Sequence, residues 1–344
     1  MFLSRGKSKN QQGLAKIAFF GTDEFAAQTL ETLINASVHE LHRAPPIRGA
    51  ESSRLRFKIA LVVTQPDRPT GRKQEMEPPP VKIVAEKYGI EVLQPETLKN
   101  ISTTVGDADL RPLPMADINI VYRYGLIIPK NILDIPTHGT INIHPSLLPK
   151  YRGASPIQTA IMNGDAETGI TIMQMDEAMD HGSILAQEIF PIELNDTYET
   201  LSRKMTPRVN ELLLQIIPKF ISGEIKPKPQ DDAQVTFTKI LSRDDGKIDW
   251  AKSAQEIYNQ YRGLTPWPGV WTMWEGKRLK LLTITPSPVR GGTVGGVSVE
   301  NEKIYISCGA DAIEVLELQL EGKKPMEAKI FIQGYQRIHG LKLI

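Results

Sequence analysis

Cysteine is almost absent from this chain of 344 residues. Cys308 stands alone, so no disulfide can form within the chain and no cysteine-rich site can hold a metal. This usage is typical of a protein that works in a reducing compartment, and we expect a cytoplasmic location.

Long apolar segments and charge of one sign are also missing. No run of about 18 or more apolar residues occurs, so no membrane span is expected. The net charge is only +1, with 26 basic and 28 acidic side chains in residues 1–235 and 15 and 12 in residues 236–344. This mild asymmetry permits a nucleic-acid partner without arguing for one.

Two familiar binding motifs do not occur either. Gly21-Thr22-Asp23 lacks the Gly-x-Gly-x-x-Gly pattern, which argues against a dinucleotide site. His39-Glu40-Leu41-His42 resembles half of a metal motif, but its spacing is wrong for a helical zinc site, and we expect no metal. Residues 1–15 lack the apolar core of a secretory signal, so we expect a disordered tail; a short organellar presequence is the alternative.

The first two thirds of the chain predict an α/β fold. Apolar strand-like runs are Lys16–Phe20, Lys58–Val63, Ile90–Leu93, Ile118–Val121 and Thr140–Ile143. Helical patterns are Glu24–Asn35, Val81–Tyr88 and Asp196–Ile221. The alternation favours a Rossmann-like parallel sheet covered on both faces in residues 16–221. Pro207 and Pro218 should kink or divide the last helix.

The last third has a different pattern. Residues 222–235 contain Gly223, Pro227 and Pro229 and are predicted to be a linker. Short strand-like segments follow at Leu279–Ile284, Lys303–Ser307 and Ala312–Leu320. Gly- and Pro-rich turns separate them, which favours a small β-barrel in residues 236–344.

The most informative residues lie where the Thr140–Ile143 strand should end. Asn142 and His144 are two apart, and alternate strand residues point to the same face. One side chain offers amide hydrogen bonds, and the other can gain or lose a proton near neutral pH. Asp180 is the natural third member of this group. It is far from His144 along the chain, but folding can bring the two side chains together.

The stretch Asn142-Ile143-His144-Pro145-Ser146-Leu147-Leu148-Pro149, with Asp180-His181-Gly182 downstream, resembles the active-site pattern of the folate-dependent formyltransferase family. Further segments resemble the members of this family that formylate methionyl-tRNA. They are Phe20-Gly21-Thr22, Thr64-Gln65-Pro66-Asp67-Arg68-Pro69 and Glu167-Thr168-Gly169-Ile170-Thr171-Ile172-Met173-Gln174-Met175. The resemblance covers residues 16–344.

The resemblance implies transfer of the formyl group of 10-formyltetrahydrofolate to the amino group of methionine on initiator methionyl-tRNA, a step of translation initiation. It implies that residues 16–221 hold the folate and the chemistry, and that an OB-like barrel helps to dock the tRNA. Initiator methionyl-tRNA and the folate donor are therefore the expected partners, and the protein should be a monomer.

Asn142 and His144 are assigned to the oxyanion that forms during transfer, and Asp180 to orienting His144 and managing the proton that leaves the amine. Hydrogen-bond donors placed where negative charge develops contribute much of the stabilisation of the transition state. Losing one of them lowers the rate on the order of 100- to 1000-fold. The alternative is that Asn142 closes a turn and that His144 is a satisfied loop histidine.

The resemblance also assigns folate contacts. They are Ser146, Leu147, Leu148, Pro149, Tyr124 and Gly125. Arg123 stands where the family usually has a small residue. An unpaired buried guanidinium is costly, so Arg123 must find a carboxylate or reach water. Contact with the folate glutamate tail and a structural role are both open.

Arg72, in Gly71-Arg72-Lys73, matches the family loop that grips the tRNA acceptor end, although Glu75 and Glu77 make this loop less basic than expected. An ordinary solvated loop is the alternative. The tryptophans of Gly263-Leu264-Thr265-Pro266-Trp267-Pro268-Gly269-Val270-Trp271-Thr272 are expected to pack the barrel rather than to touch RNA. Lys323 and Lys324 are either phosphate contacts or a solvated pair.

Ser37–Arg56 is an insertion relative to the family pattern, and its arginines offer a further tRNA contact. Two other functions remain open. A formyltransferase for amino sugar nucleotides would share Asn142, His144 and Asp180 without needing the Arg72 loop. A catalytically silent tRNA-binding protein would bind RNA in a salt-dependent way without folate turnover.

Overall fold

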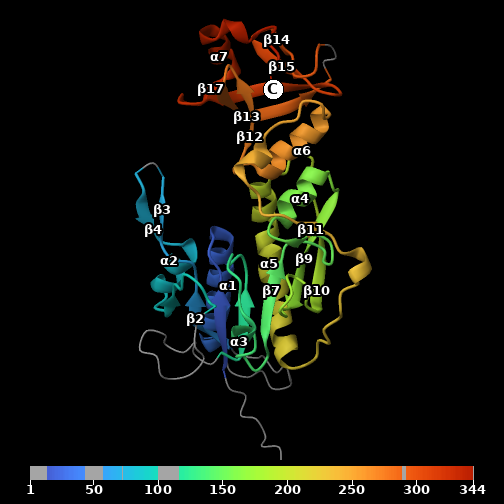
Figure 1. Cartoon of the computed structure of the whole chain (residues 1–344). Coiled ribbons are helices and arrows are strands. Elements are labelled where there is room, and N and C mark those ends of the chain that lie inside the picture. Colours follow the sequence, from blue (N-terminus) through green and yellow to red (C-terminus); the bar gives the residue numbers. More distant parts are fainter. Residues whose placement is uncertain (1–13, 43–56, 72, 100–115, 289–291, 344) are drawn as a thin grey trace, which may run out of the picture. The chain divides into compact units, whose positions relative to one another are not determined.

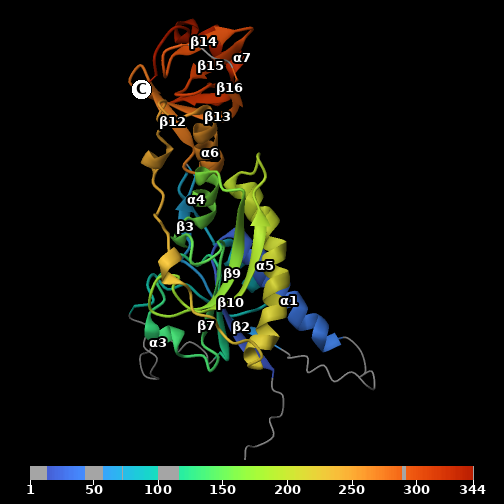
Figure 2. The same cartoon turned by 90° about the vertical axis from the view of Figure 1, so that its right-hand side faces the viewer.

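The computed structural model describes residues 14–42, 57–71, 73–99, 116–288 and 292–343 (Figures 1 and 2). They form two compact units. The first unit lies within residues 1–144, 170–188 and 205–232, and the second within residues 145–169, 189–204 and 233–344. The predicted tail, Arg72 and residues 43–56 of the insertion lie outside the described residues. The predicted domain boundaries at 221 and 236 stay predictions.

A seven-stranded sheet runs in the order β10-β9-β7-β6-β1-β2-β5. Its strands are β1 Ala15–Phe20, β2 Phe57–Val63, β5 Val92–Leu93, β6 Ile118–Val121, β7 Thr140–His144, β9 Glu167–Gln174 and β10 Ile184–Pro191. The neighbouring pairs from β7 to β5 are parallel, whereas β9 is antiparallel to β7. The predicted parallel-dominated, Rossmann-like sheet is therefore confirmed.

Buried apolar runs explain the central strands. Ile17, Phe19 and Phe20 of β1 are fully buried, as are Ile118 and Ile120 of β6. Strands buried on both faces show continuous apolar sequence rather than alternation. Because these strands are parallel, their carboxyl ends meet at one edge of the sheet, which is where ligands bind in open α/β sheets.

The helices beside this sheet are α1 Glu24–His42, α2 Pro80–Lys87, α3 Lys130–Leu133 and α5 Tyr198–Ile221. Helix α1 is longer than predicted, because no Pro or Gly interrupts the sequence before Pro45. Helix α5 is a single element that includes Pro207 and Pro218, so the predicted possibility of a division is wrong. Its buried stripe runs past Pro207 as far as Ile217, and this packing outweighs the backbone hydrogen bond lost at Pro207. The stripe consists of Leu201, Met205, Val209, Leu213 and Ile217.

The second unit contains an antiparallel sheet of order β12-β13-β16-β15-β14, with β17 beside β16. Its strands are β12 Val270–Trp274, β13 Lys277–Ser287, β14 Val297–Glu300, β15 Lys303–Ser307, β16 Ala312–Leu320 and β17 Met326–Glu327. Its helices are α4 Pro156–Asn163, α6 Ala254–Leu264 and α7 Ala328–Gly334. The sequence predicted a small β-barrel in the last third, and the structure has an antiparallel sheet domain there.

Short elements complete the described chain. They are the strands β3 Arg68–Thr70, β4 Glu75–Glu77, β8 Arg152–Gly153 and β11 Phe237–Thr238, and the 3-10 helices η1 Asp232–Gln234, η2 Arg243–Gly246 and η3 Gln336–Ile338. Strands β3 and β4 form an antiparallel hairpin, and β8 pairs with β11. Within the described part of the chain, every helix is too short or too polar to cross a membrane.

Candidate active site

Asn142 and His144 lie at the carboxyl end of β7. Asn142 is the register partner of Val121 on β6 and of Met173 on β9, and His144 is the partner of Thr171 on β9. The strand is therefore held on both sides up to the point where it ends. His144 is 4% exposed and Asn142 is half-buried. Both side chains leave the same face of β7, as their spacing predicts.

Asp180 reaches this position from the loop between β9 and β10. Its Oδ2 lies 3.6 Å from Nδ1 of His144, which is an ion-pair distance and longer than a hydrogen bond. Catalytic hydrogen bonds are often long before substrate binds. The structure thus brings together the aspartate and the histidine that the sequence suggested as partners.

The loop around Asp180 has an unusual backbone. Asp180 has a φ of 49°, a left-handed conformation that side chains other than glycine rarely adopt. Two contacts hold it, because Nε2 of Gln230 donates to the carbonyl oxygens of Asp180 at 2.8 Å and of Gly182 at 2.9 Å. A Cβ on Gly182 would lie 1.7 Å from the carbonyl oxygen of Gln174, so only glycine fits there.

Tyr124 and Gly125 lie beyond the carboxyl end of β6. The carbonyl oxygen of Tyr124 accepts hydrogen bonds from Oγ1 of Thr22 and from Nε2 of Gln65, each at 2.9 Å. Gly125 has a φ of 80°, and a Cβ there would lie 2.7 Å from Nε2 of Gln65. These contacts join three segments that were separate motifs in the sequence.

The Tyr124 ring is 2% exposed and packs edge-on against Phe20. Burial raises the pKa of its phenol far above the usual value, so the hydroxyl stays protonated. Among the described residues this hydroxyl has no hydrogen-bond partner. An orphaned donor at the predicted folate site fits a ligand that carries polar ring atoms.

Arg123 finds a carboxylate within the first unit. Its Nη1 lies 3.1 Å from Oδ2 of Asp23, and its guanidinium lies over the ring of Phe25, 4.6 Å from the centroid. Oδ1 of Asp23 meanwhile accepts from the backbone N–H groups of Phe25 and Ala26 at the start of α1. Of the two roles left open for Arg123, these contacts support the structural one.

The loop after β7 contains the other predicted folate contacts. Ser146 is fully buried, and its hydroxyl donates to the carbonyl oxygen of Lys150 at 2.6 Å. Leu148 is also buried, whereas Leu147 and Pro149 are partly exposed. Ser146 and Leu148 therefore fix the shape of the loop, and Leu147 and Pro149 offer apolar surface.

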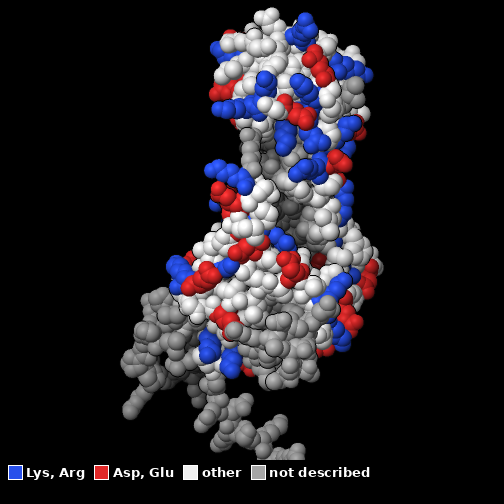
Figure 3. Space-filling model, turned by 60° about the vertical axis from the view of Figure 1, so that its left-hand side comes forward, with Lys and Arg blue, Asp and Glu red and all other residues white. Residues whose placement is uncertain are grey.

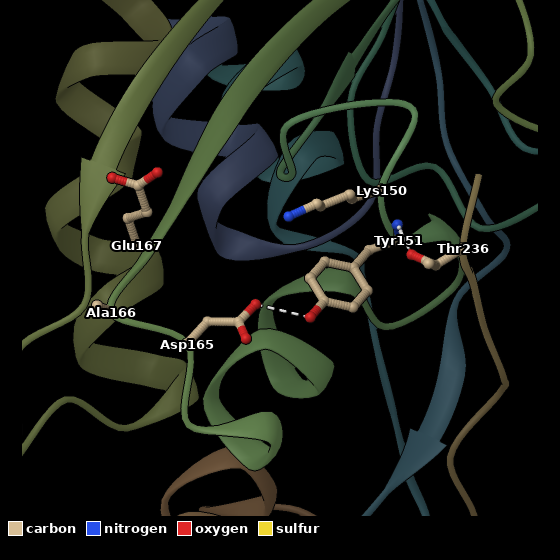
Figure 4. Close-up of a pocket in the computed structure, with 6 residues that line it drawn as sticks. All are labelled: Lys150, Tyr151, Asp165, Ala166, Glu167 and Thr236. Atoms are coloured by element: carbon tan, nitrogen blue, oxygen red, sulfur yellow. Dashed lines mark hydrogen bonds between the residues drawn. The ribbon is translucent and has the colours of Figure 1, made fainter. Parts of the chain in front are cut away.

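A cavity of about 380 Å³ opens in the second unit directly after this loop. Lys150 and Tyr151 line one side, and Asp165 and Glu167 line the other (Figure 4). The hydroxyl of Tyr151 donates to Oδ2 of Asp165 at 2.6 Å, and burial followed by this contact raises the pKa of Tyr151. Sequence reasoning assigned no role to these side chains, although Lys150 and Tyr151 directly follow the recognised motif.

The expected tRNA contacts are only partly described. Arg72 falls outside the described residues, between β3 and β4. In the same hairpin, Arg68 pairs with Glu96 at 2.8 Å. Trp271 and Trp274 are buried, but Trp267 is 55% exposed, so the expectation that the tryptophans pack the barrel is wrong for Trp267. Flanking prolines at 266 and 268 hold Trp267 in a turn rather than in a strand.

No group of three or more His, Cys, Asp or Glu side chains is arranged to hold a metal ion within the described ranges. The nearest acid–imidazole cluster is His181 with Asp176 and Asp232. Nδ1 of His181 lies 2.6 Å from Oδ2 of Asp176, and Nε2 lies 3.8 Å from Oδ2 of Asp232. Sequence reasoning missed this cluster because its members are spread between positions 176 and 232.

Comparisons with known proteins agree with this geometry. The family model for formyl transferase matches residues 16–217, and that for the formyl transferase C-terminal domain matches residues 240–336. The methionyl-tRNA formyltransferase of Citrifermentans bemidjiense is 40% identical over 93% of this chain and 94% of its own length. The protein of that name from Acidobacterium capsulatum is 41% identical over 93% and 96%.

Among solved structures, the sugar 3N-formyl transferase WlaRD, determined in the presence of dTDP and 5-N-formyl-THF, has a similar fold. The TM-score is 0.59 at 18% identity, with 91% of this chain and 100% of that chain covered.

Proposed function

Because the chain belongs to the formyl transferase family, we propose that it transfers the formyl group of 10-formyltetrahydrofolate to the amino group of methionine on initiator methionyl-tRNA. Relatives named methionyl-tRNA formyltransferase match more than nine tenths of this chain at about 40% identity, which supports methionyl-tRNA as the acceptor. The similarity to sugar formyltransferases supports the fold alone. Such an enzyme would act in translation initiation, in the cytoplasm.

The observation that carries the chemistry is the approach of Asp180 to Nδ1 of His144, two residues after Asn142 on the same strand. The neutral amine attacks the formyl carbon, and the carbonyl oxygen becomes an oxyanion. Asn142 donates from its amide, and His144 donates from Nε2 when both ring nitrogens carry protons and Nδ1–H faces Asp180. The intermediate collapses when the bond to the folate nitrogen breaks and that nitrogen takes up the proton lost by the amine, and no covalent bond to the enzyme forms.

Asp180 has two tasks in this proposal. It orients the His144 ring, which fixes the nitrogen that reaches the oxyanion. It also takes up the proton lost by the amine, directly or through one water. His144 is almost fully buried, so donors around the oxyanion act in a low dielectric and are worth more than in water.

The folate donor would bind at the carboxyl edge of the first sheet. Tyr124 and Gly125 would line its site in the first unit. The buried, unpaired hydroxyl of Tyr124 gives the ring system a donor to bond with. Ser146 and Leu148 would hold the loop in place rather than contact the ligand closely.

The tRNA would contact Arg72 and exposed Lys and Arg side chains of the second unit. Figure 3 shows Lys and Arg side chains gathered over the part that contains β12 to β16. Guanidinium and ammonium groups bind phosphate, so these side chains are suited to a nucleic-acid backbone. The chain would act as a monomer.

The test is formyl transfer to methionyl-initiator tRNA, with an amino sugar nucleotide as parallel acceptor. We expect formylated methionyl-tRNA only, and we expect Asn142→Ala and Asp180→Asn to lower kcat on the order of 100- to 1000-fold. Formylation of the sugar alone would move the proposal to the other acceptor. Full activity of both variants would refute the mechanism.

A further inference from the structure

We propose that His181 is a positioning residue whose protonated ring clamps the loop that carries Asp180. The proposal rests on the catalytic role proposed for Asp180 and adds a residue that acts through it. All of the side chains involved belong to the first unit.

The loop between β9 and β10 needs such a clamp. Asp180 has a left-handed backbone with a φ of 49°, so the turn is strained and must be held by its surroundings. Gln230 supplies one anchor, through hydrogen bonds to the carbonyl oxygens on both sides of His181. Oδ1 of Asp176 supplies another within the loop, by accepting from the N–H of Ala178 at 3.0 Å.

His181 adds a link between these two anchors. Its Nδ1 is 2.6 Å from Oδ2 of Asp176, at the start of the loop, and its Nε2 is 3.8 Å from Oδ2 of Asp232, in η1. Asp232 follows Gln230 by two residues. The loop therefore contacts one short segment twice, through the amide of Gln230 and through the carboxylate of Asp232. The ring therefore bridges the loop to residues 230–232.

The bridge depends on the charge of the ring. When both nitrogens carry protons, His181 donates to Asp176 and attracts Asp232 at the same time. When one proton is lost, the ring keeps a single donor, and its other nitrogen offers a lone pair to a carboxylate. Histidine makes this change between pH 5 and 8. The clamp should hold at the acidic end of this range and loosen as pH rises.

Other charged groups around the loop do not replace this switch. Asp180 is the preceding residue, and its carboxylate is directed to His144. Glu177 lies on the same loop and pairs with Lys130 of α3 at 3.3 Å. Asp231 precedes Asp232 in the chain. His144 faces Asp180 but is unchanged in every variant, so a pH-dependent difference between His181→Gln and wild type reports on the His181 ring.

The size of the effect follows from exposure. The His181 and Asp232 side chains are 46% and 67% exposed, so water screens their attraction. An exposed ion pair of this kind changes an equilibrium by about 2- to 5-fold. Because Asp180 sits next to His181, the loss should appear in kcat rather than in KM for the folate donor.

The experiment compares wild type, His181→Gln, Asp232→Asn and Glu177→Gln in formyl transfer from pH 6 to pH 8.5. Glu177→Gln is the matched control, because it removes one carboxylate from the same loop without touching the imidazole. For His181→Gln and Asp232→Asn we expect the wild-type to variant ratio of kcat to be about 2- to 5-fold at pH 6. The ratio should fall toward one at pH 8.5, while the control ratio stays constant.

A second measurement does not need activity. Amide hydrogen exchange at Ala178 and its loop neighbours, followed by NMR at pH 6, should be faster in His181→Gln and Asp232→Asn than in wild type, and Glu177→Gln shows how much the loss of another ion pair of this loop contributes. A kcat ratio independent of pH, or equal exchange in all four proteins, would overturn the clamp. Failure of wild type to formylate any acceptor would instead refute the proposed function and leave the exchange result to decide the clamp.

Discussion

Arg262 and Cys308 show how this protein treats ionisable groups that it buries. Arg262 is 4% exposed, and its Nη1 and Nη2 donate to the carbonyl oxygen of Asp196 at 3.0 Å and to Oδ1 of Asn259 at 2.6 Å. Burial lowers the pKa of Arg262. The usual pKa of a guanidinium is so high, however, that the group stays charged and needs hydrogen-bond acceptors. Cys308 can instead remain neutral, and burial raises its pKa to about 11.

The raised pKa of Cys308 gives a prediction about pH. A thiol whose pKa is higher in the folded than in the unfolded state favours folding below the unfolded pKa of about 8.5. That contribution is lost as pH rises from there toward 11. At pH 8 we therefore expect native protein to react with a disulfide reagent at least about 30-fold more slowly than protein unfolded in urea, since the thiolate is the reactive form.

The measurement is the labelling rate of this single thiol with and without urea. Access and thiolate fraction both slow the native reaction, so a native rate close to the unfolded rate would show that Cys308 is neither buried nor protonated. Cys308→Ser provides the background rate, because the chain has no other cysteine.

At the scale of elements, strands with buried apolar runs were predictable from the sequence. Ile118–Val121, Lys303–Ser307 and Ala312–Leu320 have the predicted bounds. Strand β10 was missed because its burial alternates while its sequence, Ile-Leu-Ala-Gln-Glu-Ile-Phe-Pro, is not strictly alternating. The division considered for α5 did not occur, and at Pro207 the tertiary packing of one face outweighs the local effect of the proline.

The contact between α4 and α6 gives the prediction at this scale. A Cβ on Gly263 would lie 2.7 Å from Cγ of Met162 and 2.9 Å from the carbonyl oxygen of Gln158. Alanine favours helix over glycine by about 1 kcal/mol, but a clash with backbone cannot be relieved by rotating a side chain. We expect Gly263→Ala to lower the free energy of unfolding by about 1–3 kcal/mol.

Gly334→Ala is the matched control, because Gly334 ends α7 and an added Cβ meets nothing within 4 Å. It should be neutral or stabilise by up to about 1 kcal/mol. Urea unfolding of both variants measures the difference. A Gly263→Ala protein as stable as Gly334→Ala would mean that α4 and α6 do not pack as closely as described.

At the scale of the whole molecule, the order of motifs carried more information than composition did. The pairing of His144 with Asp180 followed from a recognised pattern, although a separation of 36 positions hides it from local rules. Residues 145–169 and 189–204 belong to the second compact unit, which a linear reading cannot foresee because tertiary contacts decide it. The His181 cluster and the cavity beside Tyr151 depend on the same kind of distant contact.

The net charge of the whole molecule is only +1, and this bears on how it binds tRNA. A nearly neutral protein gains little from its overall field, so tRNA affinity should depend on a few local phosphate contacts. If Arg72 makes one of them, Arg72→Ala should make the slope of log affinity against log salt shallower by about 1. Arg68→Ala is the control from the same hairpin, because Glu96 already pairs with that guanidinium at 2.8 Å. Filter binding of initiator tRNA at several salt concentrations measures both slopes, and equal slopes for the two variants would argue against a phosphate contact by Arg72.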